Sequence, residues 1–363
     1  MRIVFYGSEH TAPARRMCQW AHEAGHEVMW AGYLGDVIGG SPARHVQIKS
    51  NDNPLPELEA IVSDFRPHLA HAFNFSFLTG FHFLTRACPL ISSVFGGLNA
   101  LVSSPHALPG VTDEIMKQSA AVIVESQLLA EAARQKFPGA AIELICLGIN
   151  PDHHKKVSPA QRRDWRAALD IPQDATVFLS ARGIGDGYRQ PEILNAFAKA
   201  LPQLPPRSRL AMVELTRGWD RRERVAELKE LAARLGVADC ICWLPELRHV
   251  MMPGVYGVSD FVINYPVADA FPSSVMEAVA CELPVISADL PAYKGSYIAR
   301  YCQLVAPDDD NELAEAMIAA AAEPAAERNR RTAAGRAHLV ERFNEAHQRT
   351  KLLTLYNQIS GAS

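Results

Sequence analysis

The sequence has no long hydrophobic run, no excess of either charge and no regular cysteine spacing. No apolar stretch reaches the roughly eighteen residues that a membrane-spanning helix requires, which argues against such a helix. The chain carries 36 Lys and Arg against 40 Asp and Glu, a formal net charge of −4, so no basic excess favours nucleic acid as a partner. Its seven cysteines are odd in number and irregularly spaced, and we expect a reduced, cytoplasmic protein.

Three specific patterns are also missing. The chain enters the strand-like run Arg2–Tyr6 at once, without a basic region and a cleavage site, so we expect no signal peptide. The glycine-rich run 183–187 is not followed by Lys and Ser or Thr, which excludes a P-loop. His22 and His26 are spaced like two ligands on one helix, but Gly25 ends that helix between them, and we expect no metal there.

Strand and helix patterns alternate along most of the chain. The strand Arg2–Tyr6, a helix to about residue 24 and a strand from Glu27 form a βαβ unit, the element of parallel sheets. The alternation stops at the polar segment Asn150–Pro159 and restarts with a strand at Thr176–Ser180. A length of 363 residues suits two domains.

We therefore predict an α/β fold of two doubly wound, Rossmann-like domains facing a cleft. The predicted ranges are 1–150, 151–340 and a C-terminal helix at 341–363 that returns to the first domain. Ligands of such sheets bind beyond the carboxyl ends of the strands.

The segment that begins at Asp269 carries the most chemical information. It is predicted to be a loop, then a helix that Ser273 or Ser274 caps, then a strand. The first turn of such a helix offers free N–H groups to a diphosphate. Glu277, one turn into the helix, can accept hydrogen bonds from ribose hydroxyls, and Asp269 can reach sugar hydroxyls. Taken alone, the two acids are also compatible with a loop acid and a solvated helix acid.

The full string from Asp269 to Ala278, with the triplet Pro284-Val285-Ile286 after it, resembles the E-x7-E signature of retaining GT-B glycosyltransferases, especially glycosyltransferase family 4. The resemblance implies that Glu277 contacts the donor ribose and that Asp269 contacts the transferred sugar. It also implies that backbone groups lie against the sugar and phosphate at Phe271, Pro272, Ser273 and Ser274. Asp269 replaces the usual first Glu, which shortens the reach by one methylene and leaves the donor sugar open.

Two arginines resemble the cations with which this family holds the donor diphosphate. Arg182 follows the strand Thr176–Ser180, and Arg189 stands near the position of the family's Lys. The resemblance implies that they neutralise the leaving group without a metal, and we expect no cofactor. A surface position is the alternative for Arg182. By the same resemblance, Leu244 and Pro245 frame the donor base, and Gly7 stands where the family's first loop approaches the phosphates.

The first half offers candidates on the acceptor side, namely His10, His71, Gly96 and Gly97. Each has an ordinary alternative: a solvated loop for His10, a structural histidine for His71 and a chain turn for the glycines. The aromatic stretch 73–84 is a candidate for peripheral membrane contact, with core packing as the alternative.

The resemblance implies a retaining transfer of a sugar from a nucleoside-diphosphate sugar to an acceptor held mainly by the first domain. The acceptor can be a saccharide, a lipid-linked molecule or a small molecule. Alternatives are a GT-B-like sugar-nucleotide epimerase, a phosphorylase and a non-catalytic nucleotide-sugar binding protein. The sequence leaves the acceptor and the oligomeric state open.

Overall fold

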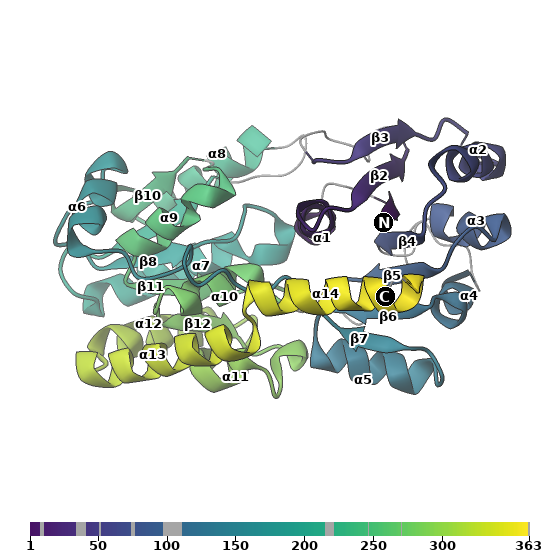
Figure 1. Ribbon diagram of the computed structural model, residues 1–363. Coiled ribbons are helices and arrows are strands. Elements are labelled where there is room, and N and C mark those ends of the chain that lie inside the picture. Colours follow the sequence, from purple (N-terminus) through teal and green to yellow (C-terminus); the bar gives the residue numbers. More distant parts are fainter. Residues whose placement is uncertain are drawn as a thin grey trace. The chain divides into compact units, whose positions relative to one another are not determined.

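The computed structural model describes residues 1–7, 11–33, 41–50, 52–73, 77–96, 111–214, 221–245, 247–269 and 271–361. The chain forms two compact units (Figure 1). The first comprises Met1–Gly148 together with Glu345–Ser363, and the second comprises Ile149–Asn344.

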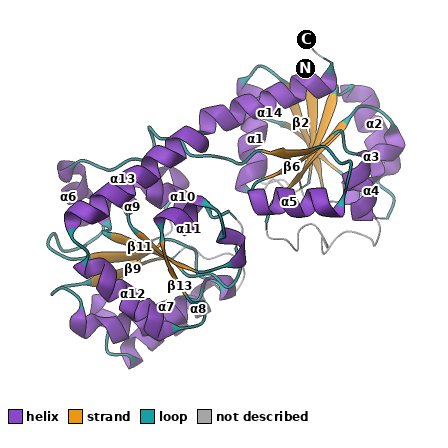
Figure 2. Cartoon of the chain, turned by 90° about the horizontal axis from the view of Figure 1, so that it is seen from below, coloured by secondary structure: helices purple, strands orange, loops and turns teal. Residues whose placement is uncertain are grey.

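The first unit is built on a parallel sheet with the strand order β3-β2-β1-β4-β5-β6-β7. Its strands are β1 Arg2–Tyr6, β2 Glu27–Gly32, β3 Arg44–Gln47, β4 Leu69–Phe73, β5 Leu90–Val94, β6 Ala121–Val124 and β7 Ile142–Leu144. Its helices are α1 Ala12–Glu23, α2 Leu55–Phe65, α3 Phe77–Thr85, α4 Val111–Gln118, α5 Gln127–Lys136 and α14 Glu345–Ser360. The inner strands are buried along nearly their whole length because helices cover both faces of the sheet (Figure 2).

Thr11 caps the start of helix α1. The Thr11 hydroxyl accepts a hydrogen bond from the Ala14 N–H at 3.4 Å, and a proline stands in the first turn. This cap satisfies one of the N–H groups that a helix start leaves without a partner.

Helix α14 lies far from α1 in sequence but packs against it within the first unit (Figures 1 and 2). The Trp20 indole N–H donates to Glu345 at 3.1 Å, and the Cys146 N–H donates to the Gln348 side chain at 3.3 Å. Leu352 and Tyr356 are fully buried in the core of this unit. The end of the chain is therefore a structural part of the first unit.

The second unit is built on a parallel sheet with the strand order β10-β9-β8-β11-β12-β13. Its strands are β8 Val177–Ser180, β9 Arg209–Val213, β10 Ile241–Leu244, β11 Phe261–Asn264, β12 Val285–Ala288 and β13 Gln303–Val305. Its helices are α6 Pro159–Ala168, α7 Gln190–Ala200, α8 Arg221–Arg234, α9 Met252–Val258, α10 Ser273–Ala280, α11 Tyr297–Tyr301, α12 Asp310–Ala322 and α13 Ala325–Arg342.

A buried arginine ties α6 to the start of the central strands. Arg166 is 2% exposed, and its guanidinium donates to the Val258 carbonyl at 2.8 Å and to Asp260 at 3.1 Å. The same Asp260 accepts from the Val177 N–H, the first residue of β8, at 2.9 Å. A buried charge needs such partners, and here they hold β8 and β11 in register.

The two sheets confirm the predicted class of two parallel, doubly wound α/β domains. In the second sheet the strand order reverses between β8 and β11. The chain leaves two such strands in opposite directions, and ligands of doubly wound sheets bind beyond the carboxyl ends at this point.

Candidate functional site

The residues predicted to bind a donor in the second unit all lie at the carboxyl ends of its strands. Arg182 follows β8, Leu244 ends β10 and Pro245 follows it, and Asp269 lies in the segment between β11 and α10. A parallel sheet collects its loops in this way at one edge.

Helix α10 starts at this edge without a side-chain cap. Pro272 occupies the N-cap position and no capping side-chain hydrogen bond is present, so the prediction that Ser273 or Ser274 caps the helix is wrong. Both serines lie inside the first turn, one and two residues after the N-cap position. The first-turn N–H groups therefore remain available to an anion.

Arg182 and Asp269 form an ion pair beside the start of α10. The guanidinium Nη1 lies 3.0 Å from the carboxylate Oδ2 and donates to the Ser274 hydroxyl at 3.3 Å. The guanidinium also lies 4.3 Å from the centre of the Tyr188 ring. Burial would lower the pKa of Arg182, but the neighbouring charge of Asp269 raises it above its ordinary value. The arginine is thus a fixed cation at the strand ends, not a solvated surface residue.

Glu277 is a buried carboxylate held by two hydrogen bonds. It is 6% exposed, which excludes a solvated helix acid. Its Oε1 accepts from His249 Nε2 at 2.9 Å, and its Oε2 accepts from the Tyr256 hydroxyl at 2.9 Å. Burial would raise the pKa of Glu277, but the hydrogen bond and charge of His249 hold it below its ordinary value. The carboxylate is therefore ionised at neutral pH.

Three residues that surround Glu277 were not predicted from the sequence. They are Tyr256 on α9, His249 at the start of the short 3-10 turn His249–Met251, and His154 in the segment before α6. His154 is 5% exposed, and its Nε2 lies 4.0 Å from Oε2 of Glu277. Burial lowers the pKa of His154 to about 4, so its ring is neutral at pH 7. The only sequence signal was a His-His pair in a polar segment, and no spacing links that pair to α10.

Arg189 is paired with a different acid from Arg182. Its guanidinium lies 2.5 Å from Asp308 and 5.4 Å from the centre of the Tyr265 ring, and the residue is 7% exposed. Its diphosphate role stays a prediction. Phe271 packs its ring against Tyr297, at 5.8 Å between ring centres.

The candidates in the first unit are glycines and histidines around the ends of β1, β4 and β5. Gly7 has φ +102°, and a Cβ there would lie 2.8 Å from the Phe73 carbonyl oxygen, so only glycine fits this approach. Gly96 has φ +119°, and its N–H donates to Glu125 at 2.9 Å. His10 and Gly97 lie outside the described residues.

His71 is fully buried, and both of its ring nitrogens are hydrogen bonded. Nδ1 lies 2.6 Å from the Tyr356 hydroxyl and Nε2 lies 2.7 Å from the Ser93 hydroxyl. This arrangement is that of a structural histidine, which links α14 to β4 and β5. An acceptor role for His71 stays a prediction.

The aromatic stretch 73–84 is partly described. Leu78 is fully buried, and Phe81 and Phe83 pack partly buried against the core, while Leu84 is 60% exposed. Residues 74–76 lie outside the described part. No helix within the described ranges has both the length and the apolar character to cross a membrane.

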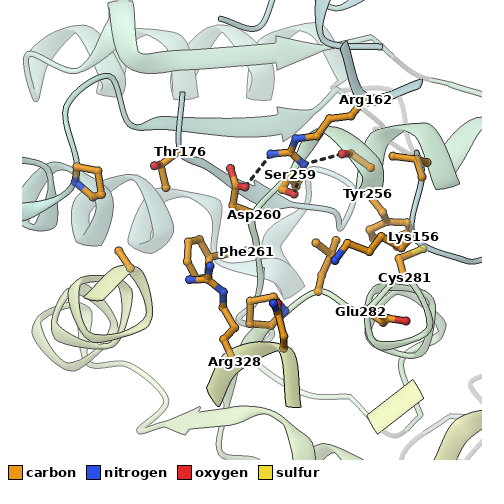
Figure 3. Close-up of a pocket in the computed structure, with 17 residues that line it drawn as sticks. Lys156, Arg162, Thr176, Tyr256, Ser259, Asp260, Phe261, Cys281, Glu282 and Arg328 are labelled. Atoms are coloured by element: carbon orange, nitrogen blue, oxygen red, sulfur yellow. Dashed lines mark hydrogen bonds and ion pairs between the residues drawn. The ribbon is translucent and has the colours of Figure 1, made fainter. Parts of the chain in front are cut away.

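A separate cavity of about 420 Å³ opens at the opposite edge of the second sheet (Figure 3). Thr176, Asp260 and Pro284, which directly precede β8, β11 and β12, are among its lining residues. Arg162, also in its wall, donates to Asp260 at 2.7 Å. This cavity therefore lies at the amino ends of the strands, away from the edge that carries Arg182 and Glu277.

Comparison with known proteins gives a family match in the second unit. Residues 161–338, which lie within the second unit, match the family model described as "Glycosyl transferases group 1". A D-inositol 3-phosphate glycosyltransferase of Saccharomonospora viridis is 25% identical over 256 residues, 69% of this chain and 58% of that protein. The chain thus spans less than two thirds of this curated relative.

Solved structures share the fold over the whole chain. Anabaena HepE in complex with UDP and glucose superposes with a TM-score of 0.79 at 17% identity and covers 99% of this chain and 100% of its own. Sucrose-phosphate synthase from Thermosynechococcus elongatus gives 0.77 at 20% identity, with 100% of both chains covered. At these identities the likeness establishes the fold, which is GT-B.

Proposed function

We propose that this chain, which belongs to the glycosyl transferases group 1 family and has the GT-B fold, transfers a sugar from a nucleoside-diphosphate sugar to an acceptor. One observation carries the proposal. At the strand ends of the second unit, the cation Arg182, the acid Asp269 and the uncapped start of α10 lie together, with the buried carboxylate of Glu277 one turn further along that helix. These are the chemical groups that a diphosphate, a sugar and a ribose require.

The donor diphosphate lies against Arg182 and the first turn of α10. The helix start contributes partial positive charge and free N–H groups, and the guanidinium contributes a full charge. Glu277 binds the ribose. Each of its oxygens already accepts one protein hydrogen bond, and each has a second lone pair for a ribose hydroxyl.

The reaction is a substitution at the anomeric carbon with retention of configuration. The bond from this carbon to the leaving phosphate oxygen breaks, and a bond to the acceptor oxygen forms on the same face. The acceptor proton passes to the leaving phosphate. Arg182 and the start of α10 stabilise the charge that develops on the diphosphate, and Asp269 orients the sugar through its hydroxyls. This route needs no protein nucleophile and no metal.

A uridine diphosphate sugar is the first donor to test. Structures of Anabaena HepE with the same fold were solved with UDP and with UDP-glucose. Asp269, one methylene shorter than Glu, leaves more room beside the sugar, so the panel should include several hexoses. The acceptor panel should include phosphorylated polyols, because curated relatives are D-inositol 3-phosphate glycosyltransferases.

The variant Glu277→Gln tests the proposal. It keeps the shape of the side chain but removes the charge that strengthens hydrogen bonds to the ribose. Each charged hydrogen bond is worth about 1.5–3 kcal/mol, so we expect donor affinity to fall by roughly 10- to 100-fold in calorimetry and transfer to fall with it.

Glu315→Gln, at an exposed position on α12, is the matched control and should behave like the wild type. Wild-type donor binding and turnover in Glu277→Gln would refute the assignment. Tight nucleotide binding by the wild type without turnover, across all acceptors, would instead show a non-catalytic binder.

A further inference from the structure

Three potential metal ligands meet at Glu277. His154 comes from the segment before α6, His249 from the 3-10 turn before α9 and Glu277 from α10. One ligand atom from each lies within 4.8 Å of the other two. In the described ranges of the chain, no other group of three His, Cys, Asp or Glu side chains meets this spacing.

The ligand atoms are close to the arrangement that a tetrahedral ion requires. His249 Nε2 lies 2.9 Å from Oε1 of Glu277, and His154 Nε2 lies 4.0 Å from Oε2. Zinc bonds of about 2.0–2.2 Å place neighbouring ligands roughly 3.3–3.5 Å apart. The ligand atoms, one from each residue, lie within 4.8 Å of one another, so the longest separation must shorten by up to roughly 1.5 Å. The His249 side chain is 63% exposed on a short turn, so most of this adjustment would fall on His249.

His154 provides an independent indication of a ligand. Its side chain is buried, yet neither ring nitrogen has a hydrogen-bond partner. Buried polar groups without partners are rare and costly. The backbone fixes the residue, because its N–H donates to the Asn150 carbonyl at 2.9 Å and its carbonyl accepts from Arg336 at 2.7 Å. A metal ion between the rings would satisfy the nitrogen that faces Glu277.

A second layer orients the carboxylate. The Tyr256 hydroxyl is buried and donates to Oε2 of Glu277 at 2.9 Å, an outer hydrogen bond of the kind that supports metal ligands. We propose that His154, His249 and Glu277 bind one divalent transition-metal ion, with Zn²⁺ as the preferred ion. Two imidazoles and one carboxylate form a zinc ligand set that leaves a fourth position open.

Metal binding would regulate donor binding at this position, a consequence that rests on the proposed function. A divalent ion on Glu277 would neutralise the charge that strengthens its hydrogen bonds to a ribose, so the ion and the ribose compete for this carboxylate. Zn²⁺ and the nucleotide donor should therefore exclude each other, although the transfer itself uses no metal.

Zinc titration of the metal-free full chain tests the site. A chelating indicator dye should report about one Zn²⁺ per chain, and Co²⁺ should give the intense visible absorption of a tetrahedral complex. His154→Phe fills the buried space but has no ring nitrogen to bind a metal. His249→Gln replaces an exposed side chain, so the substitution should not affect folding. Each should weaken Zn²⁺ binding by at least about 100-fold, since loss of even an outer-shell partner costs 10–100-fold.

His347→Gln is the control, because His347 is exposed on α14 and outside the cluster. Equal zinc affinity in the wild type and His249→Gln, or an equal loss in His347→Gln, would overturn the site. Thermal melting of each variant shows that it is folded.

Nucleotide binding in a zinc buffer tests the competition. UDP affinity of the wild type should fall as free Zn²⁺ rises, and that of His249→Gln should respond much less. UDP affinity that is independent of Zn²⁺ in a protein that binds both would overturn the competition. Failure of the metal-free protein to bind any nucleotide would count against the proposed function, while the zinc titration would still decide the metal site.

Discussion

Arg182 and Asp269 form an ion pair at the candidate donor site of the second unit. The pair is mostly buried, at 18% and 13% side-chain exposure, so the charges interact more strongly than they would in water. The same guanidinium also reaches the first turn of α10 through Ser274. The Arg182 guanidinium also lies 4.3 Å from the centre of the Tyr188 ring, a contact that a planar group can make together with the other two.

The variant Arg182→Lys should therefore lose activity although it keeps the charge. An ammonium cannot keep the contacts with Asp269, Ser274 and the Tyr188 ring together, so stabilisation of the leaving diphosphate weakens. We expect kcat to fall by roughly 10- to 100-fold in a steady-state transfer assay. Arg300→Lys, in which an exposed arginine also lies against a tyrosine ring, should leave kcat unchanged. An unchanged kcat in Arg182→Lys would contradict the assigned role.

The length of the acidic side chain at position 269 should affect the choice of donor sugar. Asp269→Glu restores the longer acid that the family signature usually has, and the extra methylene moves the carboxylate toward the sugar. We expect the ratio of kcat/KM between two donor hexoses to change by about tenfold, as measured with the donor panel. Donor hydrolysis with the same sugar preference as the wild type would show that Asp269 does not contact the sugar.

Whole elements were predictable where their own sequence is periodic and apolar. The bounds of β1 agree with the predicted strand Arg2–Tyr6 to the residue, and β8 begins one residue after the predicted start at Thr176. The short edge strands β3 and β13 were missed because each has only three or four residues, most of them partly exposed. Helix α6 was missed as well, although Ser158 and Gln161 form a capping box at its start, because the segment is polar and adjoins the predicted linker.

Packing between α6 and α9 gives a prediction at the scale of elements. A Cβ on Gly254 would lie 2.1 Å from the Trp165 ring. The two helices therefore pack closely only because residue 254 has no side chain. Gly254→Ala should lower the free energy of unfolding by about 1–3 kcal/mol, measured by urea denaturation. Gly187→Ala, where a Cβ meets nothing within 4 Å, should have a much smaller effect. Equal stability of Gly254→Ala and the wild type would show that this interface adapts.

At the scale of the whole molecule, the two ends of the chain fold into one unit. Helix α14 is held to the first sheet by His71, which bonds Tyr356. Burial lowers the pKa of His71 to about 3, whereas an unfolded histidine titrates near 6.5. Between about pH 6.5 and pH 3 His71 is protonated in the unfolded chain but neutral in the folded unit. The free energy of unfolding therefore falls as the pH falls through this range.

The titration of His71 alone should lower the free energy of unfolding of the wild type by about 2 kcal/mol between neutral pH and pH 5. The variant His71→Asn should be less stable at pH 7.5 but should lose correspondingly less on acidification. Urea denaturation across a pH series measures both. Tyr356→Phe keeps the buried histidine and should keep the wild-type slope, and parallel slopes for the wild type and His71→Asn would contradict the prediction.

The sequence by itself determined the fold class and most inner elements, because runs of buried strand residues and amphipathic helices are local patterns. It also placed Arg182, Asp269 and Glu277 near strand ends, because a strand's end can be read along the chain. The tertiary structure alone decided which side chains meet. In the structure Arg182 pairs with Asp269 and Arg189 pairs with Asp308. His71 is buried in the core against Tyr356. His154 and His249 lie beside Glu277. These contacts join segments that are remote in sequence, and no local periodicity carries that information.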